Sequence, residues 1–278
     1  MGNTSEIINI EIQLFLEAIF QKYGHDFRAY SSAHTRRRLL HRMKSEGYES
    51  LSQMQHQLLY TEDLIQPILS DFSINVTEMF RDPGFYKALR SEVFPLLKTY
   101  PFIKIWHAGC STGEEVYSMA ILLEEEGLYD RSVIYATDFN QAAISKAREG
   151  IYPISRVKNY AHGYILSGGL NTFSDFYEAG YDSIILKKSL RRNMVFSDHN
   201  LVTDNVFAEV NLILCRNVLI YFTRSLQERV VKLFFDSLPR NGILCLGNRE
   251  NLQFSKLSSH FNIENKDEKI YRKISEIA

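Results

Sequence analysis

One short segment brings together small residues and acids in a pattern that could hold a ligand. Residues 107–115 read His-Ala-Gly-Cys-Ser-Thr-Gly-Glu-Glu, a glycine-framed turn followed directly by two carboxylates. Small residues let a backbone approach a ligand closely, and the first N–H groups of a following helix are free to donate. A pyrophosphate would suit such a turn, but Glu114 and Glu115 would repel it. A ligand with an ammonium group fits better, with Glu114 as its partner.

A second acid stands at the end of the next apolar segment along the chain. Asp138 follows the segment 132–136, and a carboxylate at such a position can accept both hydroxyls of a ribose. With Glu114, it favours a nucleoside cofactor that carries an ammonium group, such as S-adenosylmethionine. The alternative is that the paired acids only complement a helix dipole and Asp138 only caps a turn. NAD also stays open, although the G-x-G-x-x-G fingerprint is absent.

The elements around these residues predict a doubly wound α/β sheet of the Rossmann-like type. A strand at 103–108, a helix from Glu114, a strand at 132–136 and a helix at 141–148 form a parallel βαβ unit. Further strands are expected at 194–196, 210–215 and 243–247, a helix at 225–238, and a final edge strand at 269–274. Ligands bind such sheets at the carboxyl ends of the strands, where the glycine turn and Asp138 are expected.

Two regions depart from this alternation and set the predicted domain organisation. Residues from about 6 to 70 are helical in periodicity, with apolar residues such as Ile10, Leu14, Phe15 and Ile19 at helix spacing. We therefore expect an all-α N-terminal domain over 1–72 and a doubly wound sheet domain over 73–278. The glycine- and tyrosine-rich stretch at about 150–190 is expected to be an insertion with a small antiparallel β element.

Composition excludes several other classes of protein. Of the 278 residues, 32 are lysine or arginine and 33 are acidic, which favours neither a nucleic-acid partner nor an acidic tail. The three cysteines have no metal-ligand or disulfide spacing, so no metal is expected and reduced thiols are the simplest interpretation. The N-terminus lacks the features of a secretory signal, and no apolar run reaches the roughly 18 residues of a membrane span. We expect a soluble, cytoplasmic protein without direct membrane insertion.

Four motifs, in order, resemble those of the chemotaxis receptor methyltransferase (CheR) family. They are Asn-Val-Thr-Glu-Met-Phe-Arg-Asp-Pro at 75–83, Ala-Gly-Cys-Ser-Thr-Gly-Glu-Glu at 108–115, Tyr-Ala-Thr-Asp at 135–138 and Cys-Arg-Asn-Val-Leu-Ile-Tyr-Phe at 215–222. The segment 269–273 also matches, and the similarity runs from about residue 10 to the end. Family members transfer a methyl group from S-adenosylmethionine to receptor glutamates, giving γ-methyl esters and S-adenosylhomocysteine.

The resemblance implies a role for each matching residue. Those implied to contact the cofactor are Asn75, Thr77, Arg81, Gly109, Glu114, Asp138, Asn200, Leu201, Arg216 and Asn217. Asn200 and Leu201 match the pair beside adenine, and Tyr221 matches a tyrosine that faces the methyl group. Our hypothesis assigns the chemistry to Arg81, Tyr221 and Arg216. Arg81 and Tyr221 would hold the incoming carboxylate in line with the methyl group, and Arg216 would support the pocket. A carboxylate nucleophile is already ionised at neutral pH, so no general base is required.

Recognition of the acceptor is expected to lie in the N-terminal domain. The basic run at 35–42 contains Arg36, Arg37, Arg38 and Arg42, and the family's receptor substrates are acidic helices, so a basic docking helix is one interpretation. A solvated helix face is the other. The insertion lacks the glycine-framed form with which some family members grip a receptor's C-terminal pentapeptide. We expect a monomer.

Three other functions are weighed against this one. A nucleic-acid methyltransferase is disfavoured because the segment after the fourth strand reads Cys-Arg-Asn-Val rather than Asn-Pro-Pro. An NAD oxidoreductase would need a pyrophosphate loop and a proton-transfer residue. A sensor or scaffold that binds the cofactor with little catalysis is the remaining alternative, and it would be marked by loss of Arg81, Asp138 or Tyr221, all of which are present.

Overall fold

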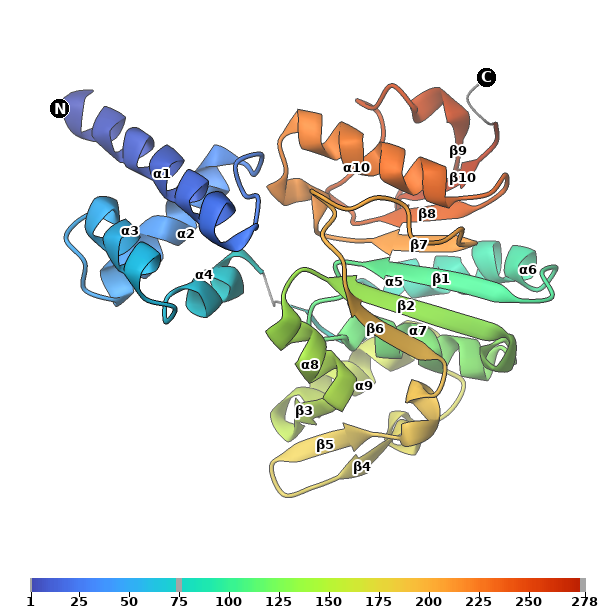
Figure 1. Cartoon of the computed structure of the whole chain (residues 1–278). Coiled ribbons are helices and arrows are strands. Elements are labelled where there is room, and N and C mark those ends of the chain that lie inside the picture. Colours follow the sequence, from blue (N-terminus) through green and yellow to red (C-terminus); the bar gives the residue numbers. More distant parts are fainter. Residues whose placement is uncertain (1, 74–76, 276–278) are drawn as a thin grey trace. The chain divides into compact units, whose positions relative to one another are not determined.

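The computed structural model describes residues 2–73 and 77–275, which form two compact units (Figure 1). The first unit comprises Met1–Ile74 together with Tyr221–Arg229, and the second comprises Asn75–Ile220 together with Val230–Ala278. The short segment Tyr221–Arg229 therefore belongs structurally to the helical N-terminal region, although it lies far from it in sequence.

The N-terminal region of the first unit was predicted to be helical, and its described residues 2–73 form four helices. They are α1 (Gly2–Tyr23), α2 (Ser32–Ser45), α3 (Leu51–Tyr60) and α4 (Ile65–Phe72). Phe15 and Ile19 of α1 are fully buried, whereas Ile10 and Leu14 are more than half exposed, so only part of the apolar pattern faces the core. Ser50 caps α3, because its hydroxyl accepts from the N–H of Gln53.

The second unit contains a seven-stranded sheet in the order β6-β2-β1-β7-β8-β10-β9. Its strands are β1 (Ile103–Ala108), β2 (Ser132–Asp138), β6 (Met194–Asp198), β7 (Leu212–Cys215), β8 (Ile243–Leu246), β9 (Phe261–Asn265) and β10 (Ile270–Lys273). The five strands from β6 to β8 are parallel, and β10 is antiparallel to both its neighbours. The predicted doubly wound sheet is confirmed. The last strand, however, is not at the edge, since β9 pairs outside it through a hairpin turn that the sequence analysis missed.

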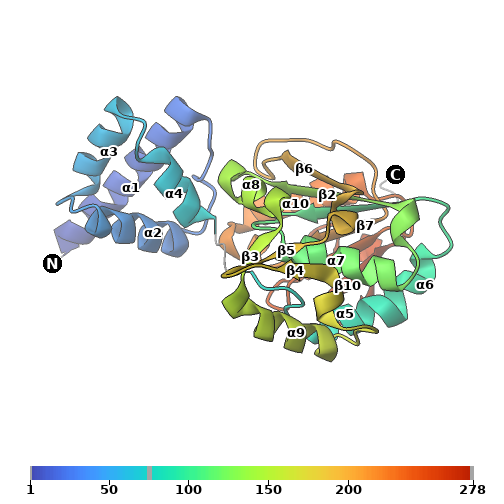
Figure 2. The ribbon, with the colours of Figure 1, turned by 90° about the horizontal axis from the view of Figure 1, so that it is seen from below.

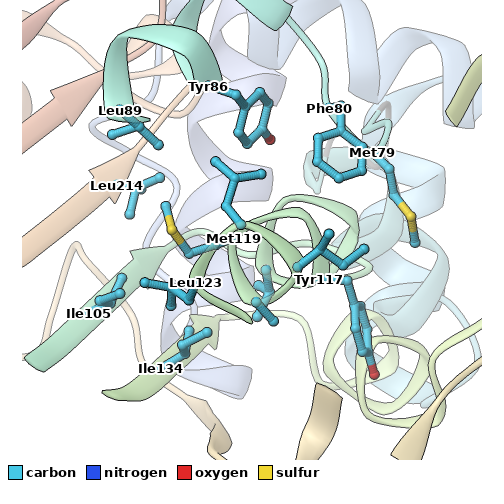
Figure 3. Packing of buried hydrophobic residues seen from close by; sticks show 14 of the residues in the cluster. Met79, Phe80, Tyr86, Leu89, Ile105, Tyr117, Met119, Leu123, Ile134 and Leu214 are labelled. Atoms are coloured by element: carbon cyan, nitrogen blue, oxygen red, sulfur yellow. The ribbon is translucent and has the colours of Figure 1, made fainter. Parts of the chain in front are cut away.

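Helices cover both faces of this sheet because its strands are apolar on both sides. The main ones are α5 (Pro83–Ala88), α6 (Phe94–Leu97), α7 (Glu114–Glu125), α8 (Gln141–Glu149) and α10 (Arg224–Ser237), with a π turn at Leu89–Val93 between α5 and α6. Ile105 faces a core that includes Met119 and Leu123 of α7 (Figure 3). Its neighbour Trp106 points to the other face, where its ring meets Phe234 of α10 edge-on.

The insertion forms a second sheet of three antiparallel strands, as expected. Their order is β3 (Ile151–Pro153), β5 (Ser183–Leu186), β4 (Tyr177–Ala179). Helix α9 (Val157–Leu166), labelled in Figure 2, was not predicted. The glycine- and tyrosine-rich composition suggested a β element, but Tyr160, Gly163 and Tyr164 recur at helix spacing and are buried. A Cβ on Gly163 would lie 3.2 Å from the carbonyl oxygen of Met79, so the glycine allows close packing.

Short 3-10 turns complete the connections. They are η2 (Tyr129–Arg131), η3 (Ile154–Arg156), η4 (Phe173–Phe176), η5 (Lys188–Arg191), η6 (Leu219–Tyr221) and η7 (Ser258–His260).

Candidate functional site

The turn between β1 and α7 has the shape that a close backbone approach requires. Gly109 and Gly113 have φ values of +84° and +91°, a region that residues with a Cβ avoid. A Cβ on Gly113 would lie 2.8 Å from the Cβ of Ala147, and one on Gly109 would lie 2.7 Å from Cγ2 of Val218. The N–H groups of Gly109 and Cys110 both donate to the carbonyl of Thr137 at the end of β2. The glycines therefore bring the loops after β1, β2 and β7 together at the carboxyl ends of the strands.

Asp138 ends β2 beside this turn and is buried. Its Oδ2 accepts from the N–H of Ser111 at 2.9 Å, and its Oδ1 accepts from the N–H of Asn140 at 3.0 Å. Burial raises the pKa of Asp138, and the backbone N–H donors of Asn140 and Ser111 oppose that rise. The carboxylate is thus held in one orientation at the place predicted for a ribose-binding acid.

Glu114 opens α7 and is almost fully buried, with 1% of its side chain exposed. The hydroxyl of Thr112 donates to its Oε2 at 2.6 Å, and Nη1 of Arg156 lies 3.3 Å from its Oε1. Burial raises the pKa of Glu114, and Thr112 and Arg156 act against it. A buried carboxylate at the end of a glycine turn suits the ammonium group of a ligand.

Glu115, the second acid, belongs to a buried network of charged groups. The two Nη atoms of Arg216 donate to Glu115 and to Asp82, each at 2.8 Å. The guanidinium lies 4.0 Å from the centre of the Phe85 ring, and the side chain is 2% exposed. His107 Nδ1 lies 3.1 Å from the other oxygen of Glu115. Burial alone would raise the pKa of Glu115, but His107 and Arg216 outweigh it and hold the pKa at about 2.

This network gives Arg216 a positioning role. It joins the loop after β7 to the start of α7 and to the residue before α5. The resemblance to the family implies that Arg216 contacts the cofactor and takes part in catalysis, and both roles stay predictions.

The loop after β7 is fixed by a carboxylate that the sequence analysis did not single out. Glu250 is 4% exposed and accepts from the N–H groups of Gly247 at 2.6 Å, Asn217 at 3.0 Å and Ile220 at 3.2 Å. Burial raises the pKa of Glu250, and these backbone donors oppose the rise. Asn217 has a φ of +62°, so Glu250 stabilises an unusual backbone at a predicted cofactor residue.

Arg81 lies in a constrained turn. Its neighbours Phe80 and Asp82 both have positive φ values, +56° and +58°. Phe80 is buried and its N–H donates to the hydroxyl of Ser118, while Asp82 is held by Arg216. The side chain of Arg81 itself is exposed. Strain of this kind costs about 1–3 kcal/mol per residue and is typical of functional sites.

The remaining predicted residues are placed as follows. Thr77 is half-buried, with its carbonyl oxygen 3.5 Å from Nη1 of Arg156, and Asn75 lies outside the described residues. Asn200 turns its Oδ1 back to the N–H of Val202 just after β6, and Leu201 is buried. Tyr221 belongs to the helical unit, where its carbonyl accepts from the N–H of Ser31. Contacts of all these residues with a ligand stay predictions.

Helix α2 carries the four arginines predicted to dock a partner. Arg42 donates from Nε and Nη2 to the carboxylate of Asp71 and from Nη1 to that of Glu46. Arg36 donates to the amide oxygen of Asn9. Arg37 is exposed and Arg38 is half-buried.

Sequence reasoning missed Glu250, Asp82, His107 and Arg156 as parts of this site. Most of their partners lie more than 30 residues away, so no local spacing links them. One signal was available, because Glu250 follows β8 at the same carboxyl edge of the sheet as the glycine turn and Asp138.

Fold and site together define a class of protein. The sheet order, the glycine turn with its buried acid and the oriented acid after β2 are features of S-adenosylmethionine-dependent methyltransferases. The residues fit this cofactor, because the glycines leave room that a Cβ would fill and the two buried carboxylates face the same turn. The chain belongs to the CheR methyltransferase family: the family's SAM-binding domain matches residues 75–270, and its all-alpha domain matches 10–73. The cofactor is S-adenosylmethionine.

Several similar proteins agree with this assignment. The chain is 48% identical to a putative methyltransferase Cher3 of Pseudomonas putida, over 95% of this chain and 97% of that one. It is 30% identical to a chemotaxis protein methyltransferase of Listeria monocytogenes, over 86% and 88% of the two chains. A corresponding protein of Salmonella typhimurium is 26% identical over 94% and 93%.

The described part of the chain contains neither a membrane-spanning helix nor a cluster of metal ligands. Over residues 2–73 and 77–275, no helix is long and apolar enough to cross a membrane. Within the same ranges, no group of three or more histidine, cysteine, aspartate or glutamate side chains could hold a metal ion.

Proposed function

We propose that this methyltransferase transfers the methyl group of S-adenosylmethionine to glutamate side chains of a chemoreceptor or related signalling protein, forming γ-methyl esters and S-adenosylhomocysteine. The observation that carries the proposal is that each buried acid around the glycine turn already has a partner within the protein. Glu115 is paired with Arg216, Asp138 and Glu250 accept from backbone N–H groups, and Glu114 is held by Thr112 and Arg156. These acids serve as positioning groups rather than as general bases.

An acceptor that is already ionised suits such a site. S-adenosylmethionine supplies an electrophilic methyl group on a sulfonium sulfur, and a glutamate carboxylate attacks it without losing a proton. The residues then accelerate the reaction by orienting the carboxylate and by excluding water. A lysine or hydroxyl acceptor would require a base to take its proton.

We assign the acceptor carboxylate to Arg81 and Tyr221. Arg81 provides a fork of N–H donors that matches a carboxylate, and its constrained turn limits the freedom of its backbone. Tyr221 would donate its phenolic O–H to the same carboxylate. Arg216 would act indirectly, by fixing the loops that carry Asp82 and Glu115.

The helical unit is proposed as the docking domain for an acidic partner helix, with residues 1–72 as its extent and 73–278 as the catalytic domain. Within α2, Arg37 and Arg38 are the better candidates, because the guanidinium of Arg42 is paired with Asp71 and that of Arg36 donates to Asn9. We further propose that the protein acts in the cytoplasm as a monomer.

The acceptor chemistry can be tested directly. The protein is incubated with S-adenosylmethionine labelled in the methyl group and with membranes of its native cells, and the products are treated with base. Methyl esters release volatile labelled methanol, whereas methylated amines keep their label. Base-stable label would overturn the glutamate assignment, and absence of transfer together with cofactor binding would favour the sensor or scaffold alternative.

The residue roles need a second experiment. We expect Arg81→Ala and Tyr221→Phe to reduce kcat strongly, and Arg37→Glu with Arg38→Glu to raise the KM for the acceptor while leaving cofactor affinity unchanged. Lys158→Glu, a charge reversal at a single exposed site in the other unit, is the control. An unchanged acceptor KM in the arginine variant would remove the docking role.

A further inference from the structure

The insertion contributes a charged side chain to the cofactor site. Arg156 lies at the end of the 3-10 turn that follows β3, and its Nη1 is 3.3 Å from Oε1 of Glu114. The same nitrogen is 3.5 Å from the carbonyl oxygen of Thr77. Tyr152 of β3 ties the insertion to the glycine turn as well, because its hydroxyl donates to the carbonyl of Thr112 at 2.8 Å. The insertion is thus part of the wall around Glu114.

We propose that Arg156 binds the α-carboxylate of the methionine portion of S-adenosylmethionine. The inference rests on Glu114 as the partner of the cofactor's ammonium group, and it does not depend on which acceptor is methylated. It gives the insertion a role in distinguishing ligands that carry a complete amino-acid end from those that do not.

Charge balance around Glu114 supports this role. An ammonium group bound to Glu114 would place two cations, itself and Arg156, next to one buried carboxylate. A second carboxylate beside Arg156 restores alternating charges, and the amino-acid end of the cofactor supplies it at a fixed distance from the ammonium group. Arginine is the side chain best suited to this task, since its planar fork can bind a carboxylate with two parallel hydrogen bonds.

Arg156 also has the freedom to take a ligand. Its side chain is 46% exposed while that of Glu114 is 1% exposed, so the guanidinium reaches the buried acid from the solvent side. Its contacts to Glu114 at 3.3 Å and to Thr77 at 3.5 Å both use Nη1, and Tyr160 also interacts with the guanidinium, which has five N–H donors in all. The other donors remain for a carboxylate that arrives with the cofactor.

A buried hydroxyl beside this pair provides a second donor. Tyr160, one turn along from Arg156, has no exposed surface, and its hydroxyl lies beside Glu114 and Arg156. Burial raises the pKa of Tyr160 to about 12, with Glu114 adding to the rise and Arg156 opposing it. The hydroxyl therefore stays protonated at neutral pH near both charged groups. A protonated, buried hydroxyl beside both groups can donate to a carboxylate that arrives with the cofactor.

The test compares two ligands that differ in this carboxylate alone. Binding of S-adenosylmethionine and of decarboxylated S-adenosylmethionine is measured by calorimetry on the full chain, without any acceptor. For Arg156→Gln we expect the affinity for S-adenosylmethionine to fall about 10- to 100-fold, as for the loss of a charge-assisted hydrogen bond. The affinity for the decarboxylated compound should stay the same or rise, because a competing cation has left Glu114.

Further variants separate recognition from structure. Arg156→Lys should recover part of the lost affinity, and Tyr160→Phe should show a smaller loss that is again confined to the carboxylate-bearing ligand. Lys158→Ala, at an exposed cation in the first turn of α9, is the control and should change neither affinity. An equal loss for both ligands would mean that Arg156 only shapes Glu114, and no loss for S-adenosylmethionine would likewise overturn the proposal. Because acceptor methylation is not measured, a wrong choice of acceptor leaves the result intact.

Discussion

Removal of the Arg216 guanidinium should destabilise the sheet unit by an amount that depends on pH. Arg216→Ala would leave Glu115 and Asp82 without their shared cation, at sites where the two side chains are 21% and 30% exposed. Removing one partner of a buried ion pair lowers the free energy of unfolding by about 3–5 kcal/mol. Because Glu115 and Asp82 are partly exposed, we expect a loss near the lower end of this range for Arg216→Ala. The lowered pKa of Glu115 has the same sign: the shift from 4.5 to about 2 corresponds to about 3 kcal/mol at neutral pH, and His107 and Arg216 share it.

The sign of the pH dependence follows from the lowered pKa of Glu115. An acid with a lowered pKa in the folded state stabilises the protein above its unfolded pKa of 4.5, and that contribution is lost as the pH falls toward 2. The variant lacks much of this contribution at every pH. The difference in unfolding free energy between wild type and variant should therefore be about 3 kcal/mol at pH 7 and smaller, by at most about 1 kcal/mol, at pH 3.5.

The assay is urea unfolding followed by the fluorescence of Trp106. This is the chain's single tryptophan, and it is fully buried in the sheet unit, so the signal reports that unit alone. Arg272→Ala, which removes the partly exposed pair with Glu264, is the matched control and should cost at most about 1 kcal/mol. A loss below about 1 kcal/mol for Arg216→Ala at pH 7, or a loss that grows as the pH falls, would refute the reasoning.

Three further predictions concern the glycine turn and its supports. Gly113→Ala should lower the free energy of unfolding by about 2–4 kcal/mol and impair cofactor binding, because its Cβ would lie 2.8 Å from that of Ala147 and its φ is +91°. Gly127 has a φ of +66° and open space around it, so Gly127→Ala should lower the free energy of unfolding by only about 1 kcal/mol in thermal unfolding. Equal costs would contradict the tight packing at the turn. Because burial raises the pKa of Glu114, its carboxylate becomes protonated at a higher pH than an ordinary glutamate does, and cofactor affinity measured by calorimetry should begin to fall at that higher pH. Glu114→Gln should bind the cofactor weakly, and its affinity should lack this pH dependence. Glu250→Gln should lower stability by about 2–3 kcal/mol in urea unfolding, because an amide presents N–H donors to backbone N–H groups, and a loss below 0.5 kcal/mol, roughly the size of a surface substitution, would exclude a role in holding the loop.

The parts of the site that could be predicted from sequence are those whose signals are local. The glycine turn and Asp138 each follow an apolar strand directly, and parallel strands bring their carboxyl ends to the same edge. The resemblance to the CheR family added residues such as Asn217 that have no local signal of their own.

The missing parts depend on contacts between distant segments. Arg216 lies 101 residues from Glu115 and 134 residues from Asp82, and Glu250 lies 33 residues beyond Asn217. In the fold, α9 was overlooked because Gly163 lowers helix propensity, yet the absence of a side chain is what lets the helix pack closely. Tertiary packing overrides the local preference there.

The contact of Gly163 with the turn at Met79 and Phe80 also bears on how this protein could diverge. Helix α9 packs through Gly163 against Met79 and Phe80, the residues that precede Arg81, so its inner face cannot change without moving that turn. Its outer face carries Ile165 and Leu166, which are exposed, and β4 beyond it is largely exposed too. Mutations can therefore accumulate on the outer surface of the insertion while its inner surface stays fixed, so that a lineage could change partners without rebuilding its catalytic machinery.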